Sequence, residues 1–147
     1  MAIVRMDNVG IVVEDLDAAV AFFTELGMEL EGRQLVDGEW AGRVVGLDDM
    51  RSEIAMMRIP GVPGKLELAT YDSPAPLGGG SAEPAIPNTL GFHRVMFAVD
   101  DIDATIARLV PLGGEVLGEV VSYADVFKLC YFRGPSGIVI GLAEQIG

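Results

Sequence analysis

The stretch NVGIVVEDLDAAVAFFTELGMELEG, residues 8–32, occurs a second time in related form as RVMFAVDDIDATIARLVPLGGEVLG, residues 94–118. The two stretches align without a gap, and ten of the 25 aligned pairs are identical. Internal similarity over such a length is the sequence signature of a fold built from repeated structural units. We therefore expect the 147 residues to contain two equivalent modules.

Each copy has the pattern of a strand followed by an amphipathic helix. Apolar residues alternate with other residues at the start of each copy, which predicts a strand with one buried face. Asp15 and Asp101 follow as expected N-caps, and apolar residues then recur at the spacing i, i+4, i+7 of a helix. Gly27 and Gly113 predict the helix ends, because glycine adopts a left-handed backbone conformation without a side-chain penalty. The residues expected on the buried strand faces are Val9, Ile11, Val13, Val95, Phe97 and Val99.

Three more strands are expected after each helix. They cover about 29–36, 52–59 and 65–70 in the first copy, and about 115–122, 127–132 and 138–143 in the second. The stretch between the copies is rich in proline and glycine, which predicts a connector with little regular structure. We therefore predict one α+β domain over residues 1–147, with module one at about 4–71, the connector at 72–90 and module two at about 91–146.

The composition excludes several classes of partner. A net charge of −12 would repel nucleic acid and anionic membrane surfaces. No stretch reaches the roughly 18 apolar residues of a membrane span, and the first residues lack the pattern of a signal peptide. Cys130 is the single cysteine and lies in the apolar run KLCYF, so we interpret it as a core residue, with a reactive thiol as the alternative. This cysteine usage favours the reducing cytoplasm.

The order strand, acid-capped helix and three strands, found twice, resembles the vicinal-oxygen-chelate superfamily of glyoxalases, bleomycin resistance proteins and extradiol dioxygenases. The stretches that carry the resemblance are NVGIVVEDLDAAVAFFTELG, KLELA, FAVDDIDATI and GPSGIVIGLAE. The resemblance covers nearly the whole chain. It implies two tandem βαβββ modules that form a cupped mixed sheet around a small-molecule pocket, often completed by a homodimer. Members include enzymes as well as metal-free binding proteins, so the fold by itself does not give the function.

The resemblance also indicates which positions to compare with metal ligands. Metal-dependent members commonly carry a His where this chain has Asn8, and a Glu in the last strand of the first module, where KLELA supplies Glu67. A second His is frequent where Arg94 stands, and the usual Glu of the final strand falls at Gly141. One of the four positions matches. The comparison therefore favours a pocket without a metal ion or other cofactor.

Glu67 and Arg94 are the candidate catalytic residues. A guanidinium repels a divalent cation, and its parallel N–H groups suit a carboxylate. We therefore expect Arg94 to pair with Glu67 or to bind an anionic or carbonyl-bearing ligand directly. The alternative is an ion pair with no role beyond mutual neutralisation. The other residues that could line an apolar ligand pocket, or belong to the core or a dimer contact, are Asn8, Trp40, Met56, Met96, Tyr123, Phe127 and Tyr131.

Three functions remain open from the sequence. The leading hypothesis is a glyoxalase/bleomycin-resistance-like protein that binds a small organic molecule in a metal-independent pocket. The second is a metal-dependent lyase, isomerase or dioxygenase whose ligands are Glu67 and His93, with Asn8 or Glu144. Side chains alternate along a strand, so His93 is expected on the face opposite to Arg94 unless a bulge intervenes. The third is a metal-free enzyme in which Arg94 polarises a carbonyl and Glu67 moves a proton.

Overall fold

The computed structural model describes residues 4–78, 88 and 90–147, and the chain divides into two compact units. Unit 1 is Met1–Leu77 and unit 2 is Gly78–Gly147. The boundary between them falls inside the expected connector 72–90, of which residues 79–87 and 89 lie outside the described residues. Each unit is described by itself below.

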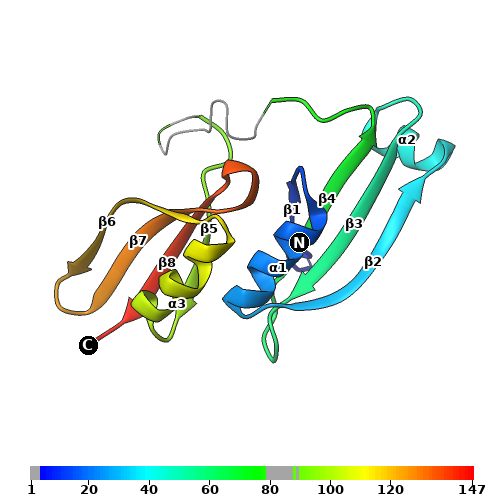
Figure 1. Ribbon diagram of the computed structural model, residues 1–147. Coiled ribbons are helices and arrows are strands. Elements are labelled where there is room, and N and C mark those ends of the chain that lie inside the picture. Colours follow the sequence, from blue (N-terminus) through cyan, green and yellow to red (C-terminus); the bar gives the residue numbers. More distant parts are fainter. Residues whose placement is uncertain (1–3, 79–87, 89) are drawn as a thin grey trace. The chain divides into compact units, whose positions relative to one another are not determined.

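Unit 1 is a four-stranded sheet with a long helix against one face (Figure 1). The strand order is β1-β4-β3-β2, with β1 parallel to β4 and the other neighbours antiparallel. Helix α1 contacts β2, β3 and β4, and we call the sheet face opposite α1 the open face of unit 1. The elements are β1 (Val9–Val12), α1 (Leu16–Leu26), β2 (Glu29–Asp37), α2 (Glu39–Val45), β3 (Arg51–Arg58) and β4 (Lys65–Ser73).

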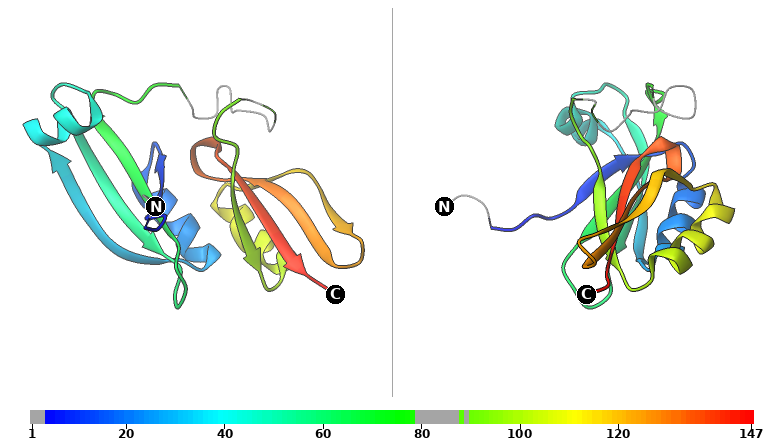
Figure 2. Two further views of the ribbon diagram at one scale, coloured as in Figure 1. Left: turned by 180° about the vertical axis from the view of Figure 1, so that it is seen from behind. Right: turned by 90° about the vertical axis from the view of Figure 1, so that its left-hand side faces the viewer.

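Unit 2 repeats this arrangement, with the strand order β5-β8-β7-β6 and β5 parallel to β8 (Figure 2). Helix α3 packs against β8, and the sheet face opposite α3 is the open face of unit 2. The elements are β5 (Val95–Val99), α3 (Ile102–Leu109), the 3-10 turn η1 (Val110–Leu112), β6 (Glu115–Tyr123), β7 (Phe127–Arg133), the 3-10 turn η2 (Pro135–Gly137) and β8 (Val139–Gln145).

The α+β fold class and its βαβββ repeat are confirmed. Asp15 accepts a hydrogen bond from the backbone N–H of Ala18, and Asp101 accepts one from Ala104, each at 3.0 Å. These acceptors satisfy N–H groups that have no partner inside the helix. Helix α1 ends at Gly27 with φ of 122°, as the sequence predicts. In the second copy α3 ends four residues before Gly113, because the chain passes through η1 before reaching that glycine.

Helix α2 was not expected from the sequence. Its seven residues, EWAGRVV, are too few to show a helical period, and it lies between two glycines. Gly46 ends it with a left-handed backbone at φ of 76°. Helix α2 contacts β2 and buries Ala41, and Met50, which lies just before β3, is buried as well. The second module carries no helix between its corresponding strands β6 and β7.

The apolar residues of the helices and of the sheet faces toward them form the core. The largest are Phe22, Phe23 and Phe132, and the rings of Phe22 and Phe23 in α1 meet edge to face at 5.3 Å. Cys130 is 4% exposed, which confirms it as a core residue, and burial raises the pKa of its thiol. The thiol therefore stays protonated at neutral pH. None of the helices in the described part of the chain has the length and apolar character needed to cross a membrane.

Candidate functional site

The open face of unit 1 carries three residues that the sequence singled out. Glu67 of β4 lies opposite Met56 of β3 and beside Gly10 of β1. Asn8 precedes β1 and, together with Met56, lines a hollow of about 360 Å³ beside Lys65. Glu67 is half-buried, and no cation of unit 1 pairs with it among the described residues. The structure thus brings Asn8, Met56 and Glu67 to one face.

The open face of unit 2 brings Arg94, Met96 and Tyr131 together around Gly141. Tyr131 of β7 and Met96 of β5 are the neighbours of Gly141 on either side in the sheet. The guanidinium carbon of Arg94 lies 5.5 Å from the centre of the Tyr131 ring, within the range of cation–π attraction. We call Arg94, Met96, Tyr131 and Gly141 the Arg94 cluster.

Gly141 is what allows these side chains to approach the sheet. A Cβ at this position would lie 3.1 Å from Cγ and 3.2 Å from Sδ of Met96, and 3.4 Å from Cδ of Arg94. The space above Gly141, where metal-dependent members commonly have a Glu side chain, is therefore filled by a thioether and the stem of an arginine. The signal in the sequence is the glycine at position 141 of GIVIGLAE, in the place where an acid is usual.

His93 meets the same aromatic ring. Its imidazole packs edge to face with Tyr131, with 5.3 Å between ring centres and an interplanar angle of 79°. Strand β5 begins only at Val95, so the alternation of side chains along a strand does not apply to His93. His93 and Arg94 therefore both contact the Tyr131 ring and do not point to opposite faces. The Nε2 atom of His93 is buried and has no hydrogen-bond partner among the described residues.

Three of the other candidates lie elsewhere. Tyr123 and Phe127 face each other at the end of the β6–β7 hairpin, where they are 66% and 37% exposed. Phe127 is four residues from Tyr131 along β7, a distance of about 13 Å at the usual rise of a strand. Trp40 belongs to α2 in unit 1 and is 62% exposed. Tyr123 and Phe127 therefore lie at the far end of the hairpin and do not contribute to the Arg94 cluster.

Glu144 lies on the helix side of unit 2. Its Oε2 accepts a hydrogen bond of 2.8 Å from the backbone N–H of Ile102, at the start of α3. This carboxylate supplements Asp101 by satisfying a second free N–H of the helix, and its charge is favourable at a helix N-terminus. Glu144 therefore caps α3, which commits its carboxylate to the helix N-terminus.

The residues at the expected metal-ligand positions do not fit a divalent cation. The set consists of an amide, one carboxylate, a guanidinium and a glycine, and metal sites require several imidazole, thiolate or carboxylate ligands around the ion. Arg94 would repel the cation. In residues 4–78, 88 and 90–147, no three His, Cys, Asp or Glu side chains come together in a way that could hold a metal ion.

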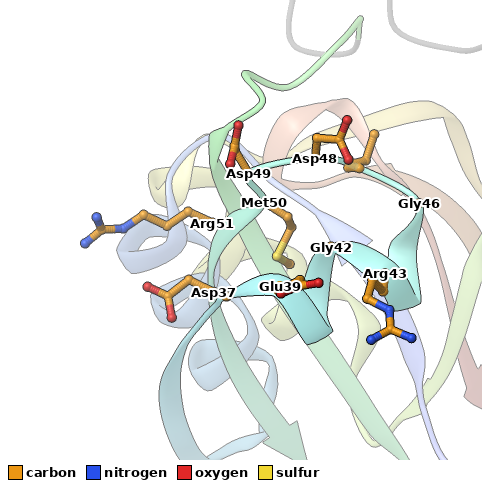
Figure 3. Close-up of a pocket in the computed structure, with 11 residues that line it drawn as sticks. Asp37, Glu39, Gly42, Arg43, Gly46, Asp48, Asp49, Met50 and Arg51 are labelled. Carbon is orange, nitrogen blue, oxygen red and sulfur yellow. The ribbon is translucent and has the colours of Figure 1, made fainter.

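A separate hollow of about 930 Å³ lies beside α2 in unit 1 (Figure 3). Its lining includes Asp48, Asp49, Arg43 and Arg51. Figure 3 shows the two guanidinium groups pointing to opposite sides and the two carboxylates pointing outward from the loop. Ligand sites have polar groups that converge on one point. Because these side chains diverge, the Arg94 cluster is the better candidate site.

Comparisons with known proteins agree with this architecture. The model of the Glyoxalase/Bleomycin resistance protein/Dioxygenase superfamily matches residues 5–142. The crystal structure of a glyoxalase family protein from Bacillus cereus is 50% identical, with a TM-score of 0.93. That match covers 100% of this chain and 99% of the Bacillus protein.

Two curated relatives match this chain over different shares of its length. A 2-epi-5-epi-valiolone epimerase from an Actinomyces species is 32% identical over 95% of this chain and 78% of its own length. A protein of Mycobacterium tuberculosis named "Putative glyoxylase CFP32" is 33% identical over 45% of this chain, and the match spans only 25% of that relative. With the family model matching nearly the whole chain, this protein belongs to the glyoxalase/bleomycin resistance protein/dioxygenase superfamily.

Proposed function

We propose that this protein binds a small organic molecule at the Arg94 cluster without a metal ion. The observation that carries the proposal is the guanidinium of Arg94, which lies 5.5 Å from the Tyr131 ring centre. No carboxylate of unit 2 pairs with Arg94 within the described residues. A cation–π contact holds the guanidinium beside the ring, and its N–H groups can still donate to a ligand. Such a group suits a carboxylate or carbonyl oxygen of a ligand.

The surroundings of Arg94 suit an organic ligand body. Met96 is 42% exposed, and Tyr131 and Leu129 present apolar surface on the same face of β7. A thioether and an aromatic ring adapt to flat or irregular ligands, and a pocket of this kind needs few polar groups to orient its ligand. We therefore infer a ligand with a compact apolar part and one oxygen-bearing group.

A metal-free enzyme is the second candidate. The name of the Actinomyces relative favours an enzyme, and the choice of a metal-free one rests on Arg94. An epimerase that acts beside a carbonyl removes a proton from carbon and returns it, with negative charge on the carbonyl oxygen in between. Arg94 would stabilise that charge, and Glu67 would move the proton. Glu67 belongs to unit 1 and Arg94 to unit 2. That the two act on one substrate is therefore itself part of this proposal.

We further propose a cytoplasmic homodimer. Large apolar side chains such as Val121 and Tyr123 are exposed on β6, the edge strand of its sheet, as a contact between copies of the chain would require. The unpaired, buried Cys130 suits a reducing compartment. Light scattering on the eluting protein tests the dimer, and a monomer at micromolar concentration would contradict it.

Metal content is the first test of the leading proposal. Protein purified without chelator is analysed by elemental mass spectrometry, and its thermal unfolding is followed with added Mg²⁺, Mn²⁺, Ni²⁺ and Zn²⁺. We expect metal well below one ion per chain and no stabilisation. Near-stoichiometric metal with a clear rise in Tm would overturn the metal-independent site and favour the alternative that uses Glu67 and His93.

Ligand binding is the second test. A set of small carboxylic acids and ketones is screened by thermal shift against the wild type, Arg94→Gln and the control Arg51→Gln. Arg51 is an exposed arginine beside the α2 hollow. Loss of a charge-assisted hydrogen bond is expected to weaken binding by about tenfold or more in Arg94→Gln. Equal binding by the wild type and Arg94→Gln would overturn the role of Arg94.

A further inference from the structure

The buried Nε2 of His93 is a polar atom without a partner in the described residues. Buried polar atoms in folded proteins are nearly always hydrogen-bonded, because a buried group without a partner loses the hydrogen bonds it made to water. An atom in this state is either a local defect or a group whose partner arrives with a ligand. The position of His93 distinguishes these two possibilities.

His93 and Arg94 contact the same tyrosine. The Arg94 guanidinium carbon lies 5.5 Å from the Tyr131 ring centre, and the His93 ring centre lies 5.3 Å from it. A small molecule bound over this ring would lie beside both side chains, and it would reach the covered Nε2 by displacing the atoms packed over it. The edge-to-face packing on Tyr131 also restricts the imidazole, so its nitrogen is held in place before the ligand binds.

We propose that His93 determines specificity by forming a hydrogen bond from Nε2 to a hydroxyl group of the ligand held by Arg94. This inference rests on the proposed function. The ligand class is a hydroxylated carboxylic acid or ketone, with the carboxylate or carbonyl oxygen on Arg94 and the hydroxyl on His93. A hydroxyl both donates and accepts, so it satisfies Nε2 in either neutral tautomer of the ring.

The inference predicts opposite effects on stability and binding for one substitution. His93→Phe keeps an aromatic ring against Tyr131 and removes the buried nitrogen. Without its unsatisfied atom the ligand-free protein should unfold at the same or a higher temperature. Binding of a hydroxylated ligand should nevertheless weaken, because the hydroxyl loses its partner. A purely structural histidine would change stability alone.

The experiment uses 3-phenylpropanoate and its 2-hydroxy and 3-hydroxy derivatives as probes. Their dissociation constants are measured by NMR titration of the full chain in 0.15 M salt, for the wild type, His93→Phe, His93→Gln and Arg94→Gln. We expect the wild type to prefer at least one hydroxylated probe by about 2- to 10-fold, the effect of one net hydrogen bond. His93→Phe should lose this preference, and His93→Gln should keep part of it through its side-chain amide.

The outcomes separate this inference from the proposed function. Binding that depends on Arg94 without any preference for a hydroxyl in the wild type would overturn the role of His93 alone. The same holds if His93→Phe keeps the preference. If none of the probes binds the wild type, or if Arg94→Gln binds them equally well, both proposals are overturned. The comparison of probes on the wild type remains decisive if His93→Phe does not fold.

Discussion

Units 1 and 2 fill the space between helix and sheet with different pairs of side chains. Unit 1 uses two methionines, and unit 2 uses a glycine and a phenylalanine. Met28 and Met57 are both buried in unit 1. In unit 2, Gly114 aligns with Met28 in the repeat, and Phe132 has the sheet position of Met57 by strand register. A Cβ on Gly114 would lie 2.1 Å from a ring carbon of Phe132. The side-chain volume that unit 2 lacks at Gly114 is supplied by the larger ring of Phe132, as a closely packed core requires.

On the open faces, too, a small and a large residue change places between the units. Here the change alters the chemical groups on the surface, because an acid is lost. In unit 1 the small residue is Gly10 and the larger one is Glu67, whereas unit 2 has Met96 and Gly141 at the equivalent places. A Cβ on Gly10 would meet no atom within 4 Å, whereas the space over Gly141 is occupied. The helix side therefore preserves packing between the two copies, and on the open side the place of the acid is taken by a glycine that Met96 and Arg94 cover.

The largest expected effect comes from breaking the exchange on the helix side. Gly114→Ala would force a methyl group into the buried Phe132 ring, and overpacking of this kind should lower the free energy of unfolding by about 3 kcal/mol. Phe132→Met introduces the residue type that unit 1 has there and should recover part of the loss in the double variant. Urea denaturation of both single variants and the double variant measures the coupling. Strictly additive losses would contradict the proposed compensation.

The open-face exchange can be reversed in the same manner. The double variant Met96→Gly with Gly141→Glu gives unit 2 the residue pattern of unit 1. The new carboxylate should pair with Arg94, so binding of 3-phenylpropanoate should weaken by about tenfold or more, while circular dichroism stays unchanged. Met96→Gly with Gly141→Gln is the matched control, because the neutral amide fills the same space and does not neutralise Arg94. Unchanged affinity in the double variant would argue against the Arg94 cluster as the binding site.

The helix caps should show a smaller difference between the units. Asp15→Ala removes the side-chain cap of α1 and should cost about 1 kcal/mol. Asp101→Ala should cost about half as much, since Glu144 still accepts from the N–H of Ile102. Urea denaturation of the two variants tests this order. Equal losses would mean that Glu144 does not support α3.

The smallest effects are expected at the exposed ion pairs on the helix sides. Arg33 bonds Asp17 and Glu53, and Lys128 bonds Asp103. Hydrogen bonds raise the pKa of Arg33, with the largest contribution from Asp17 and the next from Glu53. The hydrogen bond to Asp103 raises the pKa of Lys128. A raised pKa in a basic group stabilises the fold below the ordinary pKa, and this stabilisation is lost as the pH rises through the folded-state pKa.

These three ion pairs should therefore contribute no pH dependence near neutrality. Asp103→Asn should lower stability slightly more than Asp17→Asn, because Arg33 keeps Glu53 as a partner. Denaturation curves at 0.05 M and 1 M NaCl measure both losses, which should shrink in high salt. A loss that does not change with salt would show that the carboxylates act through packing rather than charge.

The features that the sequence predicted correctly are those that depend on residues close together along the chain. The alternation from Val9 to Val13, the caps Asp15 and Asp101 and the stop at Gly27 depend on residues a few positions apart, so they predicted the repeat and the α+β class correctly. Cys130 was placed in the core by its apolar neighbours, and the structure confirms it. Family membership followed from the same repeated pattern.

The tertiary structure decided which side chains meet. His93 and Arg94 are adjacent in the sequence, but only the late start of β5 and the pairing of β7 with β8 bring both against Tyr131. The same pairing places Gly141 beneath Arg94, and the helix side of β8 holds Glu144 as a cap. These contacts join residues that are tens of positions apart. They depend on strand register, which hydrogen bonding between strands sets and local sequence patterns do not record.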